Sequence, residues 1–165
     1  MYKRQTYAVL GEDPKLSWAE WAFSYLLREL RPYEALSFVR FFGFPLKAAL
    51  SEPQVFEEIV FSETPQLRTD KRLVMEVQRD GKLRGVLLFI CLDFGEAGVV
   101  NTWTSQTSWA TPYVRFRSPE SVRRGDLVEM SVRTDLAGDP RYAIEVTHRA
   151  EGSARVIGEY AWVGD

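Results

Sequence analysis

The fold class is decided by the stretch Leu73-Val-Met-Glu-Val-Gln-Arg-Asp-Gly-Lys-Leu-Arg-Gly-Val86, which continues as Leu87-Leu-Phe-Ile-Cys-Leu92. Its first part places apolar side chains at Leu73, Met75 and Val77, the period of a strand with one buried face. Asp80-Gly81 then predicts a tight hairpin turn, because primed turns need a positive φ at their centre. The run Leu87–Leu92 is too uniformly apolar for a half-exposed strand, so we expect a strand that is covered on both faces.

A second hairpin is predicted by the turn-rich segment Ser118–Asp126 and the alternating run that follows it. In that run Val128, Met130 and Val132 share one face. Two more alternating runs lie near the C-terminus, with inward-facing candidates at Tyr142, Ile144, Val146, His148, Val156, Tyr160 and Trp162. Antiparallel hairpins in series predict a mainly β protein, an antiparallel β-barrel or sandwich.

The composition excludes several classes of partner. The net charge is -2 with acidic and basic residues interspersed, so the sequence carries no basic patch for nucleic acid. No run reaches the roughly 18 apolar residues that a membrane helix needs. The single cysteine, Cys91, excludes a disulfide within the chain, and its apolar neighbours favour a small buried residue. We therefore expect a cytoplasmic protein with no nucleic-acid or membrane partner.

The N-terminal residues need separate treatment. Tyr2-Lys-Arg-Gln5 is the peptide that a common sequencing-adapter end encodes, so we interpret residues 1–5 as a non-native segment. The alternative is a genuine basic N-terminus. Residues 6–165 are then expected to form a single β-barrel-like domain, with a helical arm inserted at residues 14–44.

The arm is predicted by helix start and stop signals. Ser17 and Glu20 form a capping box, and the helix that begins there should end near Leu30, before Pro32. A second helical piece is expected from Tyr33 to Phe42, ending at Gly43. The expected arm is rich in aromatic residues. A two-helix hairpin cannot bury all of their rings by itself, which indicates a dimerisation surface. The candidates are Trp18, Trp21, Tyr25, Phe38, Phe41 and Phe42. The alternative is that the helices complete the core of their own domain.

Catalytic chemistry is hardly visible in the sequence. His148 is the only histidine and has no evident acid partner, so we interpret it as a strand residue, and Glu57 as solvated surface. The count of histidines and cysteines excludes a metal site built on several of them. The sequence has no G-x-G motif for a dinucleotide or phosphate. One polar, aromatic loop could line a pocket, with substrate-cleft candidates at Trp103, Ser108, Trp109 and Thr111; packing is the alternative role of the two tryptophans.

The order of these features resembles a known family. An early strand, an aromatic arm ending in Gly43-Phe44, and Leu46-Lys-Ala-Ala-Leu-Ser-Glu-Pro53 resemble the region that follows the cofactor domain of protein arginine methyltransferases. The resemblance continues through Arg79-Asp-Gly81, Gly85–Phe94, Asn101-Thr102, Phe116 and Arg124-Gly-Asp126. It covers about residues 6–150 and depends on the order of features rather than on one invariant motif.

The resemblance implies a substrate-binding and dimerisation domain of a bacterial class I methyltransferase. The β part would be the substrate domain, and the arm would form a homodimer. The S-adenosylmethionine site would lie in a cofactor domain that this chain lacks, so the chain itself would hold no cofactor and have no catalytic residues. One departure affects the methyl acceptor: the family's Thr-His-Trp corresponds to Thr107-Ser108-Trp109, without the histidine. The acceptor could therefore be another protein side chain or a small molecule.

Two other classes of function remain open from the sequence. The chain could be a stand-alone sandwich that binds a carbohydrate or peptide, with Trp103 and Trp109 as an exposed stacking platform. It could also be a purely structural oligomerisation module, in which the arm at residues 14–44 carries assembly.

Overall fold

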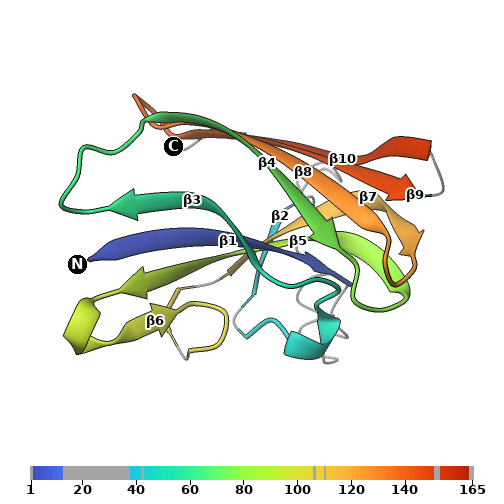
Figure 1. The fold of residues 1–165 in the computed structure, drawn as a ribbon, viewed down its shortest axis with the longest axis horizontal. Helices are drawn as coiled ribbons and strands as arrows, with labels where there is room; N and C mark the ends of the chain where they lie inside the picture. Colours follow the sequence, from blue (N-terminus) through green and yellow to red (C-terminus); the bar gives the residue numbers. More distant parts are fainter. Residues whose placement is uncertain are drawn as a thin grey trace, which may run out of the picture.

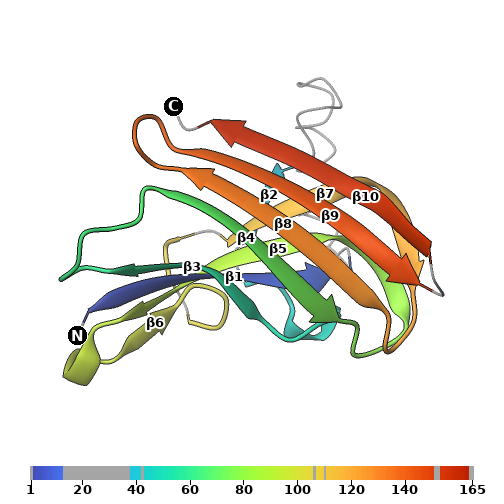
Figure 2. The same cartoon turned by 45° about the horizontal axis from the view of Figure 1, so that its top comes forward.

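The computed structural model describes residues 2–12, 38–41, 43–105, 107–109, 111–150 and 153–163. These residues form two antiparallel sheets that lie face to face (Figures 1 and 2). The mainly β, antiparallel prediction is confirmed. Of the two architectures that were open, the described part of the chain has the layered sandwich, and its strands do not close into a barrel.

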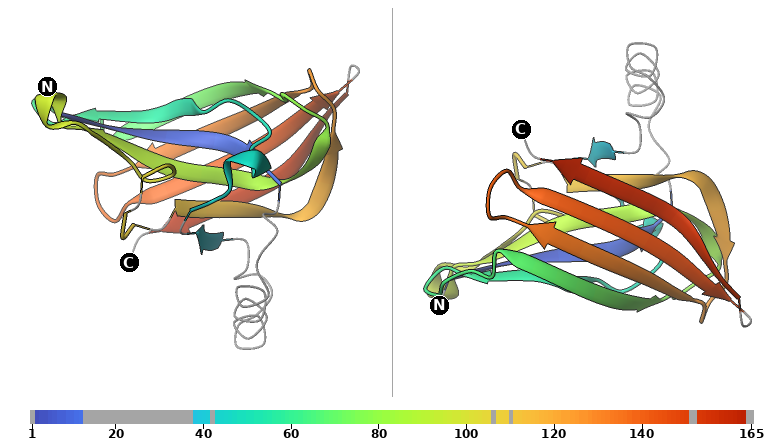
Figure 3. Two further views of the ribbon diagram at one scale, coloured as in Figure 1. Left: turned by 90° about the horizontal axis from the view of Figure 1, so that it is seen from below. Right: turned by 90° about the horizontal axis from the view of Figure 1, so that it is seen from above.

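Each sheet joins strands that are distant in the sequence. Sheet A has the order β2-β7-β5-β1-β3, with β6 paired to β5, and sheet B has the order β10-β9-β8-β4. The strands of sheet A are β1 (Lys3–Gly11), β2 (Phe38–Phe41), β3 (Gln54–Val60), β5 (Gly81–Asp93), β6 (Val99–Asn101) and β7 (Thr111–Val122). Those of sheet B are β4 (Arg68–Glu76), β8 (Leu127–Asp135), β9 (Arg141–Ala150) and β10 (Ser153–Val163). Two 3-10 helices are η2 (Leu46–Ala48) and η3 (Gly95–Ala97). Figure 3 shows both sheets from below and from above.

Both predicted hairpins are wrong in their pairing. β4 pairs with β8 and β5 with β1 and β7, so Asp80-Gly81 connects sheet B to sheet A. The segment before β8 makes the return crossing from β7. Gly81 does not have the positive φ of a primed turn, whereas Gly125 in the second crossing does, at 90°. The two crossings lie together, since Asp80 Oδ1 accepts a hydrogen bond from the Arg124 backbone N–H at 2.8 Å.

The main core lies between the sheets and confirms the predicted alternation. Its members include Leu73, Met75 and Val77 from one predicted strand, and Val128, Met130 and Val132 from another. A second, smaller core covers the opposite face of sheet A, where Leu87 and Phe89 pack with Phe44 and Ala48. Within the run Leu87–Leu92, Leu88 packs against the first core, and Leu87 and Phe89 belong to the second, so this part of the strand is covered on both faces, as predicted.

The arm prediction is corrected at one end. Phe38–Phe41 is strand β2 rather than part of a helix, and it pairs antiparallel with β7, Phe38 opposite Val114. Phenylalanine and valine favour strands, and the exposed edge of β7 offers backbone partners that local helix signals do not reveal. The candidates Trp18, Trp21, Tyr25 and Phe42 lie outside the described residues, as does most of the expected arm.

An irregular strand pairing changes one further expectation. Val156, predicted to face inward, is exposed, because the β9–β10 pairing shifts between Val156 and Gly158 and turns Ile157 toward the core. At the other end of the chain, Lys3–Gln5 form the first part of β1 and pair with both β3 and β5.

Candidate functional site

The candidate site is the loop between β6 and β7, residues 102–110, whose described part is held by its own polar side chains. Asn101 Oδ1 accepts hydrogen bonds from the backbone N–H groups of Trp103 at 2.9 Å and Thr104 at 3.3 Å. Thr102 bonds to the strand β5 twice: its Oγ1 accepts from Ile90 N–H, and its N–H donates to Ile90 O. The loop therefore begins from a fixed base on sheet A.

Two of the four predicted cleft residues use their side chains to hold the loop against the sheet. Thr111 is fully buried, and its hydroxyl donates to Thr102 O at 3.1 Å, closing the base of the loop. Trp103 is half-buried: its Nε1–H donates to Phe44 O at 2.9 Å, and its ring lies 5.1 Å from that of Phe89. Trp103 thus joins the loop to the smaller core and to the segment that precedes η2.

The other two candidates face solvent. Trp109 is 53% exposed, and Ser108 beside it is exposed as well. Thr107 fixes the backbone here, because its Oγ1 donates to Trp109 O and accepts from Trp109 N–H. The described part of the loop therefore presents one large ring, that of Trp109, and the hydroxyls of Thr104, Ser105 and Ser108 to solvent. It does not present the two exposed tryptophans that a carbohydrate-stacking platform requires.

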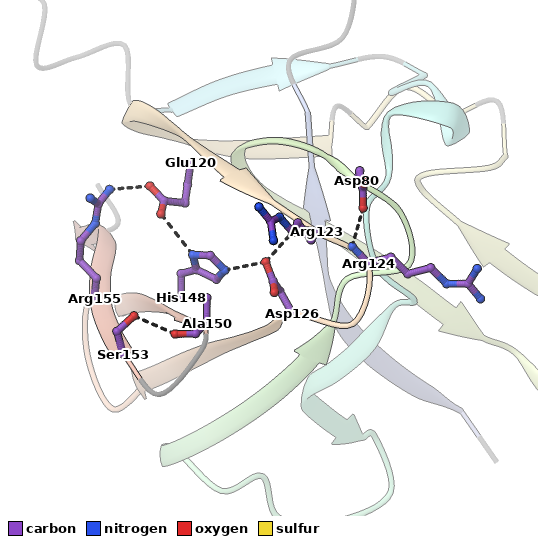
Figure 4. Close-up of polar contacts among 9 residues, drawn as sticks. All are labelled: Asp80, Glu120, Arg123, Arg124, Asp126, His148, Ala150, Ser153 and Arg155. Carbon is purple, nitrogen blue, oxygen red and sulfur yellow. Dashed lines mark hydrogen bonds and ion pairs between the residues drawn. The ribbon is translucent and has the colours of Figure 1, made fainter.

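Sequence reasoning missed the partners of His148. Its ring, 8% exposed, lies between two carboxylates: Nδ1 is 3.2 Å from Glu120 Oε1, and Nε2 is 3.1 Å from Asp126 Oδ2 (Figure 4). Burial acts to raise the pKa of Asp126, but hydrogen bonds from Arg123 N–H and from His148 outweigh it, and the pKa is lowered. Glu120 also pairs with Arg155. Only the alternation in β9, which turned His148 inward, pointed to this cluster.

A second polar cluster contains Glu57, which the sequence analysis placed on the solvated surface. Glu57 is only 5% exposed and accepts hydrogen bonds from Arg4, from Thr6 Oγ1 at 2.9 Å and from Tyr142 OH at 3.2 Å. Burial first, and then the negative charge of Glu57, raise the pKa of Tyr142 to about 12. Because Tyr142 belongs to β9 and Glu57 to β3, this cluster links the two sheets.

A cysteine and a shallow cavity are two further features of the described residues. Cys91 is half-buried, and burial, followed by the charge of Asp93, raises the pKa of its thiol. A shallow cavity of about 470 Å³ lies on the outer face of sheet B, between Asp70, Arg133 and Glu145. The described residues contain no cluster of three or more His, Cys, Asp or Glu arranged to hold a metal ion. Within the same part of the chain, no helix has the length and apolar character needed to cross a membrane.

Comparison with protein-family models gives no match, and no curated protein is similar in sequence. Solved structures are similar in fold. One is the PRMT1 enzyme–prozyme heterotetrameric complex of Trypanosoma brucei with AdoHcy, with 10% identity and a TM-score of 0.69 over 98% of this chain and 58% of that chain. Another is protein arginine methyltransferase 10 of Arabidopsis thaliana, with 8% identity and a TM-score of 0.63 over 99% of this chain and 60% of that chain. The chain therefore has an arginine-methyltransferase-like fold and spans less than two thirds of the length of these neighbours.

Proposed function

We propose that this chain is the substrate-side domain of an S-adenosylmethionine-dependent methyltransferase that resembles the arginine methyltransferases. The observation that carries this proposal is the fold likeness to two arginine methyltransferases over 98% and 99% of the chain. Both neighbours extend well beyond the matched part, and one was solved with AdoHcy, the demethylated form of S-adenosylmethionine. In this proposal the cofactor site belongs to a domain outside this chain.

The loop between β6 and β7 forms one wall of the substrate cleft in this proposal. Its base is fixed by Asn101, Thr102 and Thr111, and the backbone of the exposed Trp109 is hydrogen-bonded to the Thr107 hydroxyl. Methyl transfer depends mainly on the positioning of the acceptor and on electrostatics around the departing sulfonium. An exposed aromatic ring with exposed hydroxyls nearby suits the positioning role, and the acceptor is a protein side chain or a small molecule.

The experiment is methyl transfer from radiolabelled S-adenosylmethionine, with this chain expressed together with the coding sequence that adjoins it in its source DNA. Protein and peptide acceptors are tested in parallel with small-molecule extracts. We expect transfer that disappears when this chain is deleted. An adjoining sequence that encodes no S-adenosylmethionine-binding protein, or transfer that persists without this chain, would contradict the proposal.

We also propose that residues 14–36, the part of the expected arm that precedes β2, act as a dimerisation arm. The aromatic content of this segment supports the assignment, and the T. brucei neighbour belongs to a heterotetrameric complex. Light scattering after size exclusion should give a dimer for the intact chain. Removal of residues 14–36, which keeps β2, should give a monomer with unchanged strand content by circular dichroism. A monomeric intact chain would contradict this assignment without affecting the proposed methyl-transfer role.

A further inference from the structure

The polar cluster around His148 (Figure 4) lies where the two sheets meet along β7, β9 and β10. His148 is in β9 of sheet B, and Glu120 is in the second half of β7 of sheet A. Arg155 of β10, directly opposite His148 in the β9–β10 pairing, also binds Glu120. Glu120 is thus held by two neighbouring strands of the opposite sheet.

The second carboxylate comes from the crossing between the sheets. Asp126 lies directly before β8 and also accepts a hydrogen bond from Arg123 N–H at 2.8 Å. The same crossing is held to Val77, the residue after β4, by two backbone bonds: Val77 N–H donates to Asp126 O, and Gly125 N–H donates to Val77 O. His148 therefore connects β9 at once to sheet A and to the crossing that joins the sheets.

The hydrogen-bond chemistry of the cluster demands two protons on the ring. An ionised carboxylate only accepts, and a neutral imidazole carries one N–H and one bare nitrogen. Glu120 also pairs with the guanidinium of Arg155, and Asp126 accepts a hydrogen bond from the Arg123 N–H, which with His148 lowers the pKa of Asp126 against the effect of burial. A neutral ring would then leave one carboxylate oxygen opposite a nitrogen lone pair at 3.1–3.2 Å in a site shielded from water.

We propose that His148 is a pH-sensitive clasp, whose imidazolium form holds β9 and β10 of sheet B against β7 of sheet A. The clasp is closed while both ring nitrogens donate. Loss of one ring proton removes one of the two donors and weakens the clasp, and protonation of a carboxylate removes an acceptor. Arg155 remains a cation when the His148 ring is neutral, so it keeps a residual link from β10 to the Glu120 carboxylate. This inference is independent of the methyl-transfer proposal.

The direct test uses nitrogen-15 NMR of the imidazole ring. His148 is the only histidine in the chain, so its ring signals need no assignment provided that the purification tag contains no histidine. At pH 6 we expect both ring nitrogens to have the shifts of N–H donors, with slowly exchanging protons. One protonated and one bare nitrogen at pH 6 would overturn the proposal.

The effect on the contact between β10 and β7 is tested by hydrogen exchange of the β10 amides between pH 6 and pH 8.5. The exchange rates are corrected for the intrinsic pH dependence of amide exchange. We expect opening to increase about tenfold at the higher pH, the loss of one charge-assisted hydrogen bond. His148→Gln should remove this pH dependence. Arg149→Gln, on the adjacent position and paired with Glu129 on the outer face, should keep it. If His148→Gln does not fold, the wild-type protein alone provides the test. Corrected exchange rates of its β10 amides that do not change between pH 6 and pH 8.5 would refute the clasp.

Discussion

Tyr142 donates its phenolic hydrogen to Glu57 Oε2 at 3.2 Å, across the interface between the two sheets. The same carboxylate is paired with Arg4 and accepts from Thr6. A buried ion pair of this kind contributes little net stability when complete, but it is costly when one partner is removed. The cluster therefore makes the stability of the sandwich sensitive to pH and to single substitutions.

The raised pKa of Tyr142 predicts that the protein loses stability in alkaline solution. The pKa of Tyr142 is raised from 10.0 to about 12, so the folded state holds the proton more tightly than the unfolded state. Its contribution is complete below pH 10 and is lost as the pH rises toward 12. Urea unfolding between pH 9 and 12 should show this fall, and Tyr142→Phe should make it smaller, while Tyr2→Phe, at an exposed tyrosine, should leave it unchanged. Equal curves for wild type and Tyr142→Phe would contradict the assignment.

Removal of the Arg4 cation should cost more stability than removal of a cation at the surface. Arg4→Met leaves the buried Glu57 without its partner, and we expect a loss of about 2–4 kcal/mol in the free energy of unfolding. Lys3→Met is the matched control, because Lys3 and Glu58 form a more exposed pair at 3.7 Å, which is expected to contribute less than about 1 kcal/mol. Urea unfolding at pH 7 measures both. Equal losses would show that Glu57 does not depend on Arg4.

The close approach of β5 and β7 imposes a steric limit that can be tested at a glycine. A Cβ on Gly85 would clash with the backbone oxygen of Val114 and with the ring of Tyr113, because β5 and β7 approach closely there. Gly85→Ala should therefore cost about 1–3 kcal/mol or more, the usual range for overpacking. Gly138→Ala, in the open β8–β9 turn, meets nothing within 4 Å and should be nearly neutral. Thermal unfolding of the two variants provides the comparison.

Substitution of the two tryptophans of the candidate site should affect different properties, with Trp103 contributing to stability and Trp109 to binding. Trp103→Ala removes a packed ring and the hydrogen bond to Phe44 O, and we expect a loss of about 2–4 kcal/mol. Trp109→Ala removes a mostly exposed ring and should change stability by less than about 0.5 kcal/mol. If the loop contacts the methyl acceptor, Trp109→Ala should lower kcat/KM about tenfold or more in the active assembly. A variant with unchanged kcat/KM would remove Trp109 from the substrate cleft.

The local periodicity of the sequence predicted which segments are strands and which side chains turn inward. Leu73, Met75 and Val77, and likewise Val128, Met130 and Val132, are buried as expected. These predictions succeed because the two-residue period of a strand is a property of the strand itself. The prediction failed at Val156, where one shifted position in the β9–β10 pairing reverses the faces.

Pairing partners could not be read from the sequence in the same way. Asp80-Gly81 has the composition of a hairpin turn, yet it carries the chain from one sheet to the other, and β2 forms where helix signals ended. A strand pairs with whichever edge also covers its apolar face, and that choice depends on segments distant in the chain. The candidate site shows the same division, since the sequence named the loop but not which tryptophan is exposed.

By itself, the sequence determined a mainly β, antiparallel protein, the inward faces of its strands and an aromatic loop, because these follow from local patterns of side chains. Tertiary structure alone decided the sandwich, the burial of Glu57 and the acid partners of His148. Those partners are 28 and 22 residues away in the chain and come within hydrogen-bonding distance only when the two sheets pack together.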